Sequence, residues 1–143
     1  MKGGFTMCIY CQIINGEIPS KKIYEDEYTY AFLDIEPVSL GHTLIIPKVH
    51  AETIYDLSAE DMKNFSQSIP KVAKHLKETL KCDGLNILQN NGEYALQSVF
   101  HVHFHLIPRY SEQFDGFDPQ FETPSDTDPL LSDKIHQKLM IQD

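Results

Sequence analysis

Three histidines, His101, His103 and His105, lie within five residues, each separated from the next by one apolar residue. Alternate residues of a β-strand point to the same face, so this spacing predicts three imidazoles on one face of a strand. Two kinds of chemistry use such a set. Two imidazoles can chelate a catalytic zinc ion with a third ligand from elsewhere, or one neutral imidazole can act as a nucleophile that its neighbours position. A chance run on a solvent-facing strand is the third interpretation.

The residues that precede the histidines favour the nucleophile. Gln97 and Ser98 are neutral side-chain donors at the start of the predicted strand, and Asn90 follows the preceding one. Such donors suit phosphate oxygens, and a serine hydroxyl could also serve a leaving group. Asn90 fits ordinary turn chemistry equally well. A metallohydrolase would more usually carry carboxylates near its ligands, and the stretch 99–108 contains none.

Cys8 and Cys11 form a C-x-x-C pair near the amino terminus, and Cys82 is the third cysteine. The odd count makes a disulfide framework unexpected. The pair fits half of a zinc site, a metal-free structural pair, or a redox motif, although the βαβ context of a thioredoxin-like motif is missing. Zinc would need two more ligands. His50, directly after a predicted strand, is a natural third.

The elements that must position these residues follow from hydrophobic periodicity. Short β-rich runs bounded by turn residues predict five strands, at residues 22–25, 28–34, 42–47, 85–89 and 99–108. Apolar residues at helical spacing after Ser58 predict one long helix to Leu80, bent at Pro70. A further short helix is expected at about 130–139, in an otherwise extended tail. Strands on both sides of one main helix indicate an antiparallel α+β domain.

Length and charge narrow the function classes. The chain of 143 residues fits one domain. Its formal net charge of -9 argues against a nucleic-acid groove, which needs a basic surface, but leaves room for a single nucleotide. No apolar run approaches the roughly 18 residues that a membrane span needs, so no membrane partner is expected. The first residues lack the apolar core of a secretory signal, which predicts a cytoplasmic location.

The stretch HVHFHLI matches the His-apolar-His-apolar-His-apolar-apolar pattern of the histidine triad (HIT) family of nucleotide hydrolases and transferases. Three further blocks, CIYCQIINGEIP, YEDEYTYAFLDIEP and GHTLIIPKVH, also resemble bacterial HIT proteins of the Hint branch. The resemblance covers residues 7–110 and implies a HIT domain there, with 111–143 as a carboxy-terminal tail. It also implies the HIT-like fold, an antiparallel five-stranded sheet with one long helix, and a homodimer.

The resemblance implies a role for each residue near the triad. His103 would attack the α-phosphorus and form a nucleotidyl-histidine intermediate that water hydrolyses to a nucleoside monophosphate. His105 would contact the phosphate or assist proton transfer, while Gln97 and Ser98 would bind phosphate oxygens and the leaving group. The family often has glycine where this chain has Leu96, which places the leaving-group pocket in question.

The nucleotide pocket is also expected by resemblance. Asp34 would accept the ribose hydroxyls and Asn90 would lie near the phosphate and ribose. The purine pocket would be lined by four residues that, without the resemblance, would be interpreted as hydrophobic core: Ile9, Tyr10, Ile13 and Phe32.

Some HIT proteins carry a structural zinc that uses the first triad histidine as its fourth ligand. The resemblance then implies a Cys₂His₂ site of Cys8, Cys11, His50 and His101. Four protein ligands leave no open position, so the metal would be structural, and no catalytic metal is expected. The other histidines, His42, His75 and His136, receive no predicted role.

The function that the resemblance implies is hydrolysis of a purine nucleoside phosphoramidate or related adenylate, with adenosine favoured and adenosine monophosphate as product. One alternative is a dinucleoside polyphosphate hydrolase of the same family. The other is a nucleotide-binding regulatory protein with little turnover.

Overall fold

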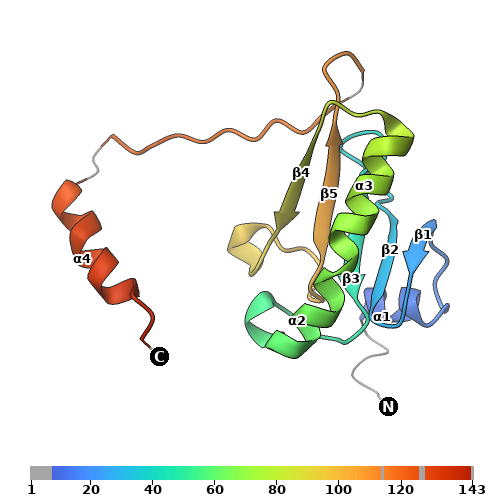
Figure 1. The fold of residues 1–143 in the computed structure, drawn as a ribbon, viewed down its shortest axis with the longest axis horizontal. Coiled ribbons are helices and arrows are strands. Elements are labelled where there is room, and N and C mark those ends of the chain that lie inside the picture. Colours follow the sequence, from blue (N-terminus) through green and yellow to red (C-terminus); the bar gives the residue numbers. More distant parts are fainter. Residues whose placement is uncertain (1–7, 114, 126–127, 143) are drawn as a thin grey trace.

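The fold is built around one five-stranded antiparallel sheet, and the computed structural model describes residues 8–113, 115–125 and 128–142 (Figure 1). The strand order is β1-β2-β3-β5-β4. The strands are β1 (Lys22–Glu25), β2 (Thr29–Leu33), β3 (Thr43–Pro47), β4 (Gly84–Gln89) and β5 (Phe104–Arg109). The helices are α1 (Ile9–Ile14), α2 (Ala59–Ser66), α3 (Ser68–Leu80) and α4 (Pro129–Leu139). The α+β class and the five-stranded antiparallel sheet are as predicted.

The central strands β2 and β3 are buried on both faces because helices cover each side. Tyr30 and Phe32 of β2 pack with Tyr10 and Ile13 of α1. The residue between them, Ala31, packs on the opposite face in a cluster with side chains of α2, α3 and β5. Figure 1 shows α3 running across that face of the sheet. Period-two alternation of side chains thus divides one sheet between two apolar cores.

The predicted bent helix is two helices, with the break at Gln67 between α2 and α3. A proline ring clashes with the carbonyl four residues earlier and lacks an N–H to donate. Pro70 therefore cannot continue the helix that contains Ser66. It is tolerated in the first turn of α3, where amide groups have no intrahelical partner.

Two expectations about the site's scaffold are wrong. The fifth strand begins at Phe104 rather than at Val99, so His101 and His103 precede β5 in an irregular segment. The helix α1 was not predicted, and it holds the two cysteines in place: the Cys8 thiol caps the helix and accepts from the Cys11 amide at 3.4 Å.

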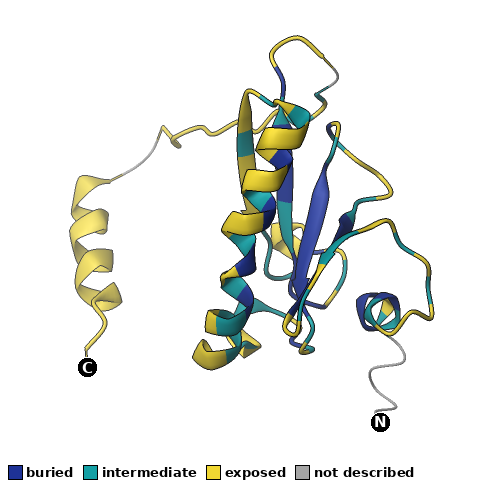
Figure 2. Cartoon of the chain, turned by 45° about the vertical axis from the view of Figure 1, so that its right-hand side comes forward, coloured by how far each residue is buried: buried dark blue, intermediate teal, exposed yellow. Residues whose placement is uncertain are grey.

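Directly after β5 the chain still contacts the body: Tyr110 donates to the Leu40 carbonyl and the Gly116 amide donates to the Val38 carbonyl. Beyond these contacts it extends away, and α4 lies apart from the sheet (Figure 1). Every described residue of α4 is exposed (Figure 2). Among the described residues, no helix combines the length and apolar character needed to cross a membrane. Residue 7, at which the predicted domain begins, lies outside the described residues.

Candidate active site

The triad divides into two groups. The ring of His101 lies beside His50, with centroids 5.1 Å apart. The ring of His103 packs edge-on against Tyr10 and His105, with a centroid distance of 5.1 Å to each. His101 and His103 are both buried. The first histidine therefore faces the cysteine pair, and the other two form a separate set.

The hydrogen bond of His103 fixes its tautomer. Its Nδ1 lies 2.8 Å from the carbonyl oxygen of His101. A carbonyl can only accept, so Nδ1 carries the proton and Nε2 presents a lone pair. Burial is the largest influence on the His103 pKa and lowers it from the ordinary histidine value. A neutral ring with an unprotonated Nε2 at pH 7 is the form that a nucleophilic histidine needs.

His42 fixes the tautomer of His105 through a short chain of donors. The backbone N–H of Val38 donates to His42 Nδ1 at 3.1 Å, so the His42 proton lies on Nε2. That nitrogen lies 2.9 Å from His105 Nδ1 and donates to it. His105 in turn keeps its proton on Nε2. The result is a neutral donor next to the His103 ring, suited to a phosphoryl oxygen.

Sequence reasoning gave His42 no role, although it is buried at the start of the site. Its Nε2 also lies 3.5 Å from a carboxylate oxygen of Asp34. The other Asp34 oxygen accepts from the Glu36 backbone amide at 2.9 Å. The sequence offered one signal, a histidine in the β-rich run before Pro47. Its partner His105 lies 63 residues further along the chain, so no local pattern could reveal the contact.

Burial, and then the charges of His103 and His42, lowers the pKa of His105 to about 4. Between the ordinary value of 6.5 and about 4, the unfolded chain binds a proton that the folded chain does not. Stability should therefore fall as the pH drops below 6.5. With allowance for partial exposure of the ring, we expect His105 to account for a loss of about 1 kcal/mol between pH 7 and pH 5. Urea unfolding at both pH values measures it, and His105→Gln should show a correspondingly smaller loss. An equal loss in both proteins would contradict the assignment.

Four ligand atoms converge at the second group. The Sγ atoms of Cys8 and Cys11 and a ring nitrogen each of His50 and His101 lie within 4.8 Å of one another. His101 Nδ1 is 3.5 Å and 3.6 Å from the two sulfurs and 3.2 Å from His50 Nδ1. Tetrahedral zinc bound by two sulfurs and two nitrogens would give about 3.5 Å for N···S and about 3.3 Å for N···N.

The tautomer of His101 agrees with metal binding. Its Nε2 donates to the Pro47 carbonyl oxygen at 2.8 Å, which leaves a lone pair on Nδ1, the atom that faces the sulfurs. Metal-bound histidines usually donate their second nitrogen in this way. The four residues fit a closed Cys₂His₂ zinc site.

Asp34, His42 and His105 also bring three ligand atoms within 4.8 Å, but they do not fit a metal. A metal on His42 Nε2 would move the ring proton to Nδ1. That atom already accepts from the Val38 amide, so two donors would face each other. This cluster sets the tautomers of His42 and His105 and does not fit a second metal ion.

Gln97, predicted to bind phosphate oxygens, has its side-chain amide hydrogen-bonded to backbone groups. It is buried, its Oε1 accepts from the Gly92 amide at 2.7 Å, and its Nε2 donates to the carbonyls of Glu52 and Val99 at 2.6 and 3.0 Å. Its side-chain amide is fully used within the protein. It therefore shapes the loop before the triad and, in this geometry, has no donor for a phosphate oxygen.

The neighbouring polar residues are more open. Ser98 is exposed and lines a cavity of about 380 Å³ that Ile9, Val99 and Phe100 also border. Asn90 is half-buried, and its Nδ2 lies 3.4 Å from the Leu96 carbonyl. The same cavity is also bordered by Cys8 and His50, so Ser98 lies beside the cysteine–histidine cluster.

The four predicted purine-lining residues do not share one environment. Ile9 is 46% exposed, whereas Tyr10, Ile13 and Phe32 are buried in one cluster. Tyr10 contacts His103, so this cluster supports the site from beneath. Only Ile9 offers an open apolar surface to a ligand.

Leu96 adopts the left-handed conformation, with φ 73° and ψ 22°, and its side chain is 78% exposed. This conformation costs a non-glycine residue about 1–2 kcal/mol. After the greater chain entropy of glycine is subtracted, Leu96→Gly should stabilise the protein by about 0.5–1 kcal/mol. Denaturant unfolding checks this value. Leu96→Ala keeps the strain and should bring no gain; equal stabilisation by both variants would contradict the explanation.

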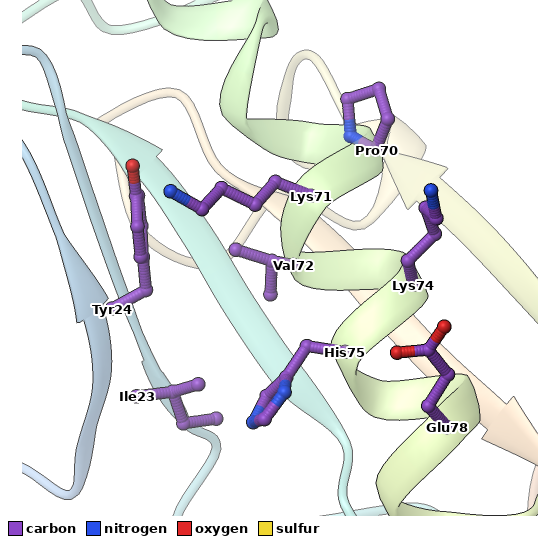
Figure 3. A pocket seen from close by; sticks show the side chains of 8 residues that line it. All are labelled: Ile23, Tyr24, Pro70, Lys71, Val72, Lys74, His75 and Glu78. Atoms are coloured by element: carbon purple, nitrogen blue, oxygen red, sulfur yellow. The ribbon is translucent and has the colours of Figure 1, made fainter.

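A larger groove of about 620 Å³ lies between β1 and α3 (Figure 3). Figure 3 shows Lys71 reaching from α3 toward the ring of Tyr24, and His75 facing Ile23. The Lys71 Nζ lies 4.8 Å from the ring centroid of Tyr24. None of the predicted site residues lines this groove.

Comparison with known proteins agrees with this geometry. The HIT domain family matches residues 15–112. The chain is 44% identical over 133 residues to "Adenosine 5'-monophosphoramidase HNT1" of Saccharomyces cerevisiae, covering 93% of this chain and 80% of that protein.

Two solved structures extend the comparison. A crystal structure of a HIT family member from Bacillus subtilis superposes with a TM-score of 0.84 at 45% identity, over 95% of this chain and 99% of that one. A "ZN-bound histidine triad family protein" from Mycobacterium smegmatis gives a TM-score of 0.73 at 38% identity, over 82% and 86% of the two chains. With the family match, the sheet and the paired tautomers of His103 and His105, the chain belongs to the HIT family.

Proposed function

We propose that this HIT-type hydrolase cleaves the α-phosphorus bond of purine nucleoside phosphoramidates or related adenylates and releases the nucleoside monophosphate. The observation that carries the proposal is the hydrogen bond from His103 Nδ1 to the His101 carbonyl, at 2.8 Å. It leaves Nε2 unprotonated in a buried ring whose pKa is lowered. The yeast relative's name, an adenosine 5'-monophosphoramidase, supports the substrate class.

In the first step His103 Nε2 attacks the α-phosphorus, a bond from nitrogen to phosphorus forms, and the phosphorus–amine bond breaks. The amine leaves with the electron pair and takes a proton, which we assign to delivery through the Ser98 hydroxyl. The Nε2–H of His105 donates to a phosphoryl oxygen as charge develops there. Water then attacks the phosphorus, and the nitrogen–phosphorus bond breaks with its electron pair returning to His103 Nε2. The proton that water loses replaces the one that Ser98 delivered to the amine, so the monophosphate leaves and the neutral His103 ring is restored.

The nucleoside would occupy the surface between α1 and the end of β2. We assign the ribose hydroxyls to the Asp34 carboxylate, whose oxygens each have lone pairs beyond the Glu36 contact. Asn90 would lie near phosphate and ribose. Ile9 would contact the purine, with Tyr10, Ile13 and Phe32 as the packed layer beneath it. Gln97 acts by holding the loop that carries Ser98.

Cys8, Cys11, His50 and His101 would hold a structural zinc ion. The interligand distances and the His101 tautomer support this assignment, as does the zinc-bound relative from Mycobacterium smegmatis. Zinc would supply a rigid link between α1 and the segment before β5. We assign no catalytic metal, because the four protein ligands complete a tetrahedral set.

A homodimer of this chain is part of the proposal, with residues 7–110 as the catalytic domain and 111–143 as the tail. The strand β4 lies at one edge of the sheet, and its Ile87 and Leu88 are 51% and 37% exposed. Edge strands with apolar side chains tend to pair with another chain. On α4, Leu131, Ile135 and Leu139 recur at four-residue spacing and are exposed, which suits helix packing on a second copy.

We also propose a cytoplasmic location, which the cysteine chemistry supports. Cys8, Cys11 and Cys82 are free thiols, and zinc-binding thiolates need a reducing compartment. A fluorescent fusion found outside the cytoplasm would overturn this.

A substrate panel tests the activity. We expect adenosine 5'-phosphoramidate to be hydrolysed at least about 100-fold faster than a diadenosine polyphosphate, measured as adenosine monophosphate released. The reverse order would favour the dinucleoside polyphosphate hydrolase. Tight monophosphate binding with negligible release from every substrate would instead make the chain a nucleotide-binding regulatory protein.

A further inference from the structure

The nucleophile lies outside the regular sheet. β5 begins at Phe104, one residue after His103, so the ladder hydrogen bonds of the strand do not extend over the segment from Val99 to His103. Within that segment the Val102 amide donates to the Ala51 carbonyl at 2.8 Å. The Val99 carbonyl oxygen accepts from Gln97 Nε2 at 3.0 Å. The His103 ring packs against Tyr10 and His105, and its Nδ1 donates to the carbonyl oxygen of His101. The direction of the His103 ring therefore depends on how His101 is held.

His101 joins the metal-type cluster to the nucleophile. Its ring has Nε2 on the Pro47 carbonyl at 2.8 Å and Nδ1 between the two sulfurs and His50. Its own carbonyl oxygen accepts the proton of His103 Nδ1 at 2.8 Å. A rotation of this residue would move both ends together. The hydrogen bond that sets the His103 tautomer is therefore made by a residue whose ring faces the cluster.

Tyr10 provides a second connection between the two groups. It lies in α1 between Cys8 and Cys11, and it is buried. Its ring makes edge contacts with His101 at 5.9 Å and with His103 at 5.1 Å between centroids. If the thiols shift, α1 carries Tyr10 with them. The packed side of the nucleophile would then change along with its hydrogen bond.

We propose that Cys8, Cys11 and His50 are positioning residues for the nucleophile, because a zinc ion bound by them holds His101 where its carbonyl fixes the tautomer and direction of His103. This rests on the proposed function and on its zinc site. Occupancy of the metal site would thus set the rate of nucleotide transfer without the metal touching the substrate. Partners that orient a reacting group from one layer away commonly matter by 10–100-fold.

The test compares the zinc-loaded protein, the same protein after chelation, and the protein reloaded with zinc. Cys8→Ser and His50→Gln remove one ligand each, and Cys82→Ser is the matched control at a thiol outside the cluster. Native mass spectrometry gives the zinc content. Single-turnover release of the leaving amine gives the transfer step, and titration with adenosine monophosphate gives binding. Nitrogen-15 NMR of the imidazoles reports the His103 tautomer.

We expect zinc removal to slow the transfer step by 10–100-fold, with the monophosphate affinity changed by less than threefold, and reloading to restore the rate. The His103 signals should change from one protonated and one bare nitrogen to an averaged pair. Cys82→Ser should behave like the unaltered chain. An unchanged transfer rate and unchanged His103 signals in folded, zinc-free protein would overturn the inference.

Circular dichroism would show whether the zinc-free protein unfolds. If it does, NMR of cadmium-113 bound in place of zinc replaces the comparison of zinc-loaded with zinc-free protein. Saturation with adenosine monophosphate should then shift the cadmium resonance in the unaltered chain and leave it in place in His103→Ala. No shift in the unaltered chain would overturn the inference. The two underlying proposals can be contradicted separately. A protein that never retains zinc would contradict the proposed metal site, and a zinc-loaded protein without turnover would contradict the proposed hydrolase activity.

Discussion

Replacing His103 by alanine should abolish turnover, with a loss of at least about 10⁴-fold in the release of nucleoside monophosphate. Removal of a nucleophile eliminates the covalent route, and what remains is the small effect of binding and charge stabilisation. The hydrogen bonds of His105, to His42, do not involve His103, so the phosphate donor should stay in place. The monophosphate affinity should therefore change by less than about threefold, which calorimetry can measure.

The control for this variant is His75→Ala. His75 is exposed on α3 and faces the groove between β1 and α3 rather than the triad (Figure 3). It should retain the full rate. Turnover within tenfold of the unaltered chain in His103→Ala would remove His103 as the nucleophile. A trapped nucleotidyl-enzyme whose modified residue maps to His103 would support it directly.

Of the changes considered, loss of the proposed zinc ion is expected to lower the free energy of unfolding the most. A ligand present at 1,000 times its dissociation constant stabilises the folded state by about 4 kcal/mol, and structural zinc sites bind at least this tightly. The four ligands come from α1, the loop after β3 and the segment before β5, so the ion would tie three separate parts of the chain. For a domain of this size, chelation should lower the melting temperature by at least about 10 °C.

Differential scanning fluorimetry with and without a chelator measures that shift. Cys8→Ser should melt near the temperature of the chelated protein and respond little to added zinc, and Cys82→Ser should keep the full zinc response. A melting temperature that a chelator does not change, in protein shown by mass spectrometry to lose its metal, would exclude a stabilising role for zinc.

The sheet was predictable because its signals are local. The runs at Lys22–Glu25 and Thr43–Pro47 are short, β-rich and bounded by turn residues, and the strands occur there within one residue. The disturbance by Pro70 was visible, but it was predicted as a bend in one long helix, whereas the chain forms two helices separated at Gln67. In contrast, α1 has only six residues, IYCQII, of which Gln12 alone is strongly polar. So short and apolar a run carries no amphipathic signal.

The missed parts of the site depend on contacts between distant residues. Alternation of apolar residues with histidine suggested a strand from Val99, yet the ring of His101 turns to Pro47 and the cysteines and the strand starts later. His42 could not be distinguished from any strand histidine, because its partner His105 is 63 residues away. Gln97 looked like a ligand donor, but three backbone groups use its amide.

The distance in sequence between the zinc ligands has a consequence for synthesis of the chain. The Cys8 thiol meets His101 across 93 residues, and the pairing of β3 with β5 must bring them together. Translation proceeds at roughly 5–20 residues per second, so both cysteines are synthesised about 5–20 s before their last proposed ligand. During that interval they are open to oxidation and to stray metal ions. The proposed metal centre could thus form only after most of the domain had been synthesised, and its thiols would be most vulnerable before folding.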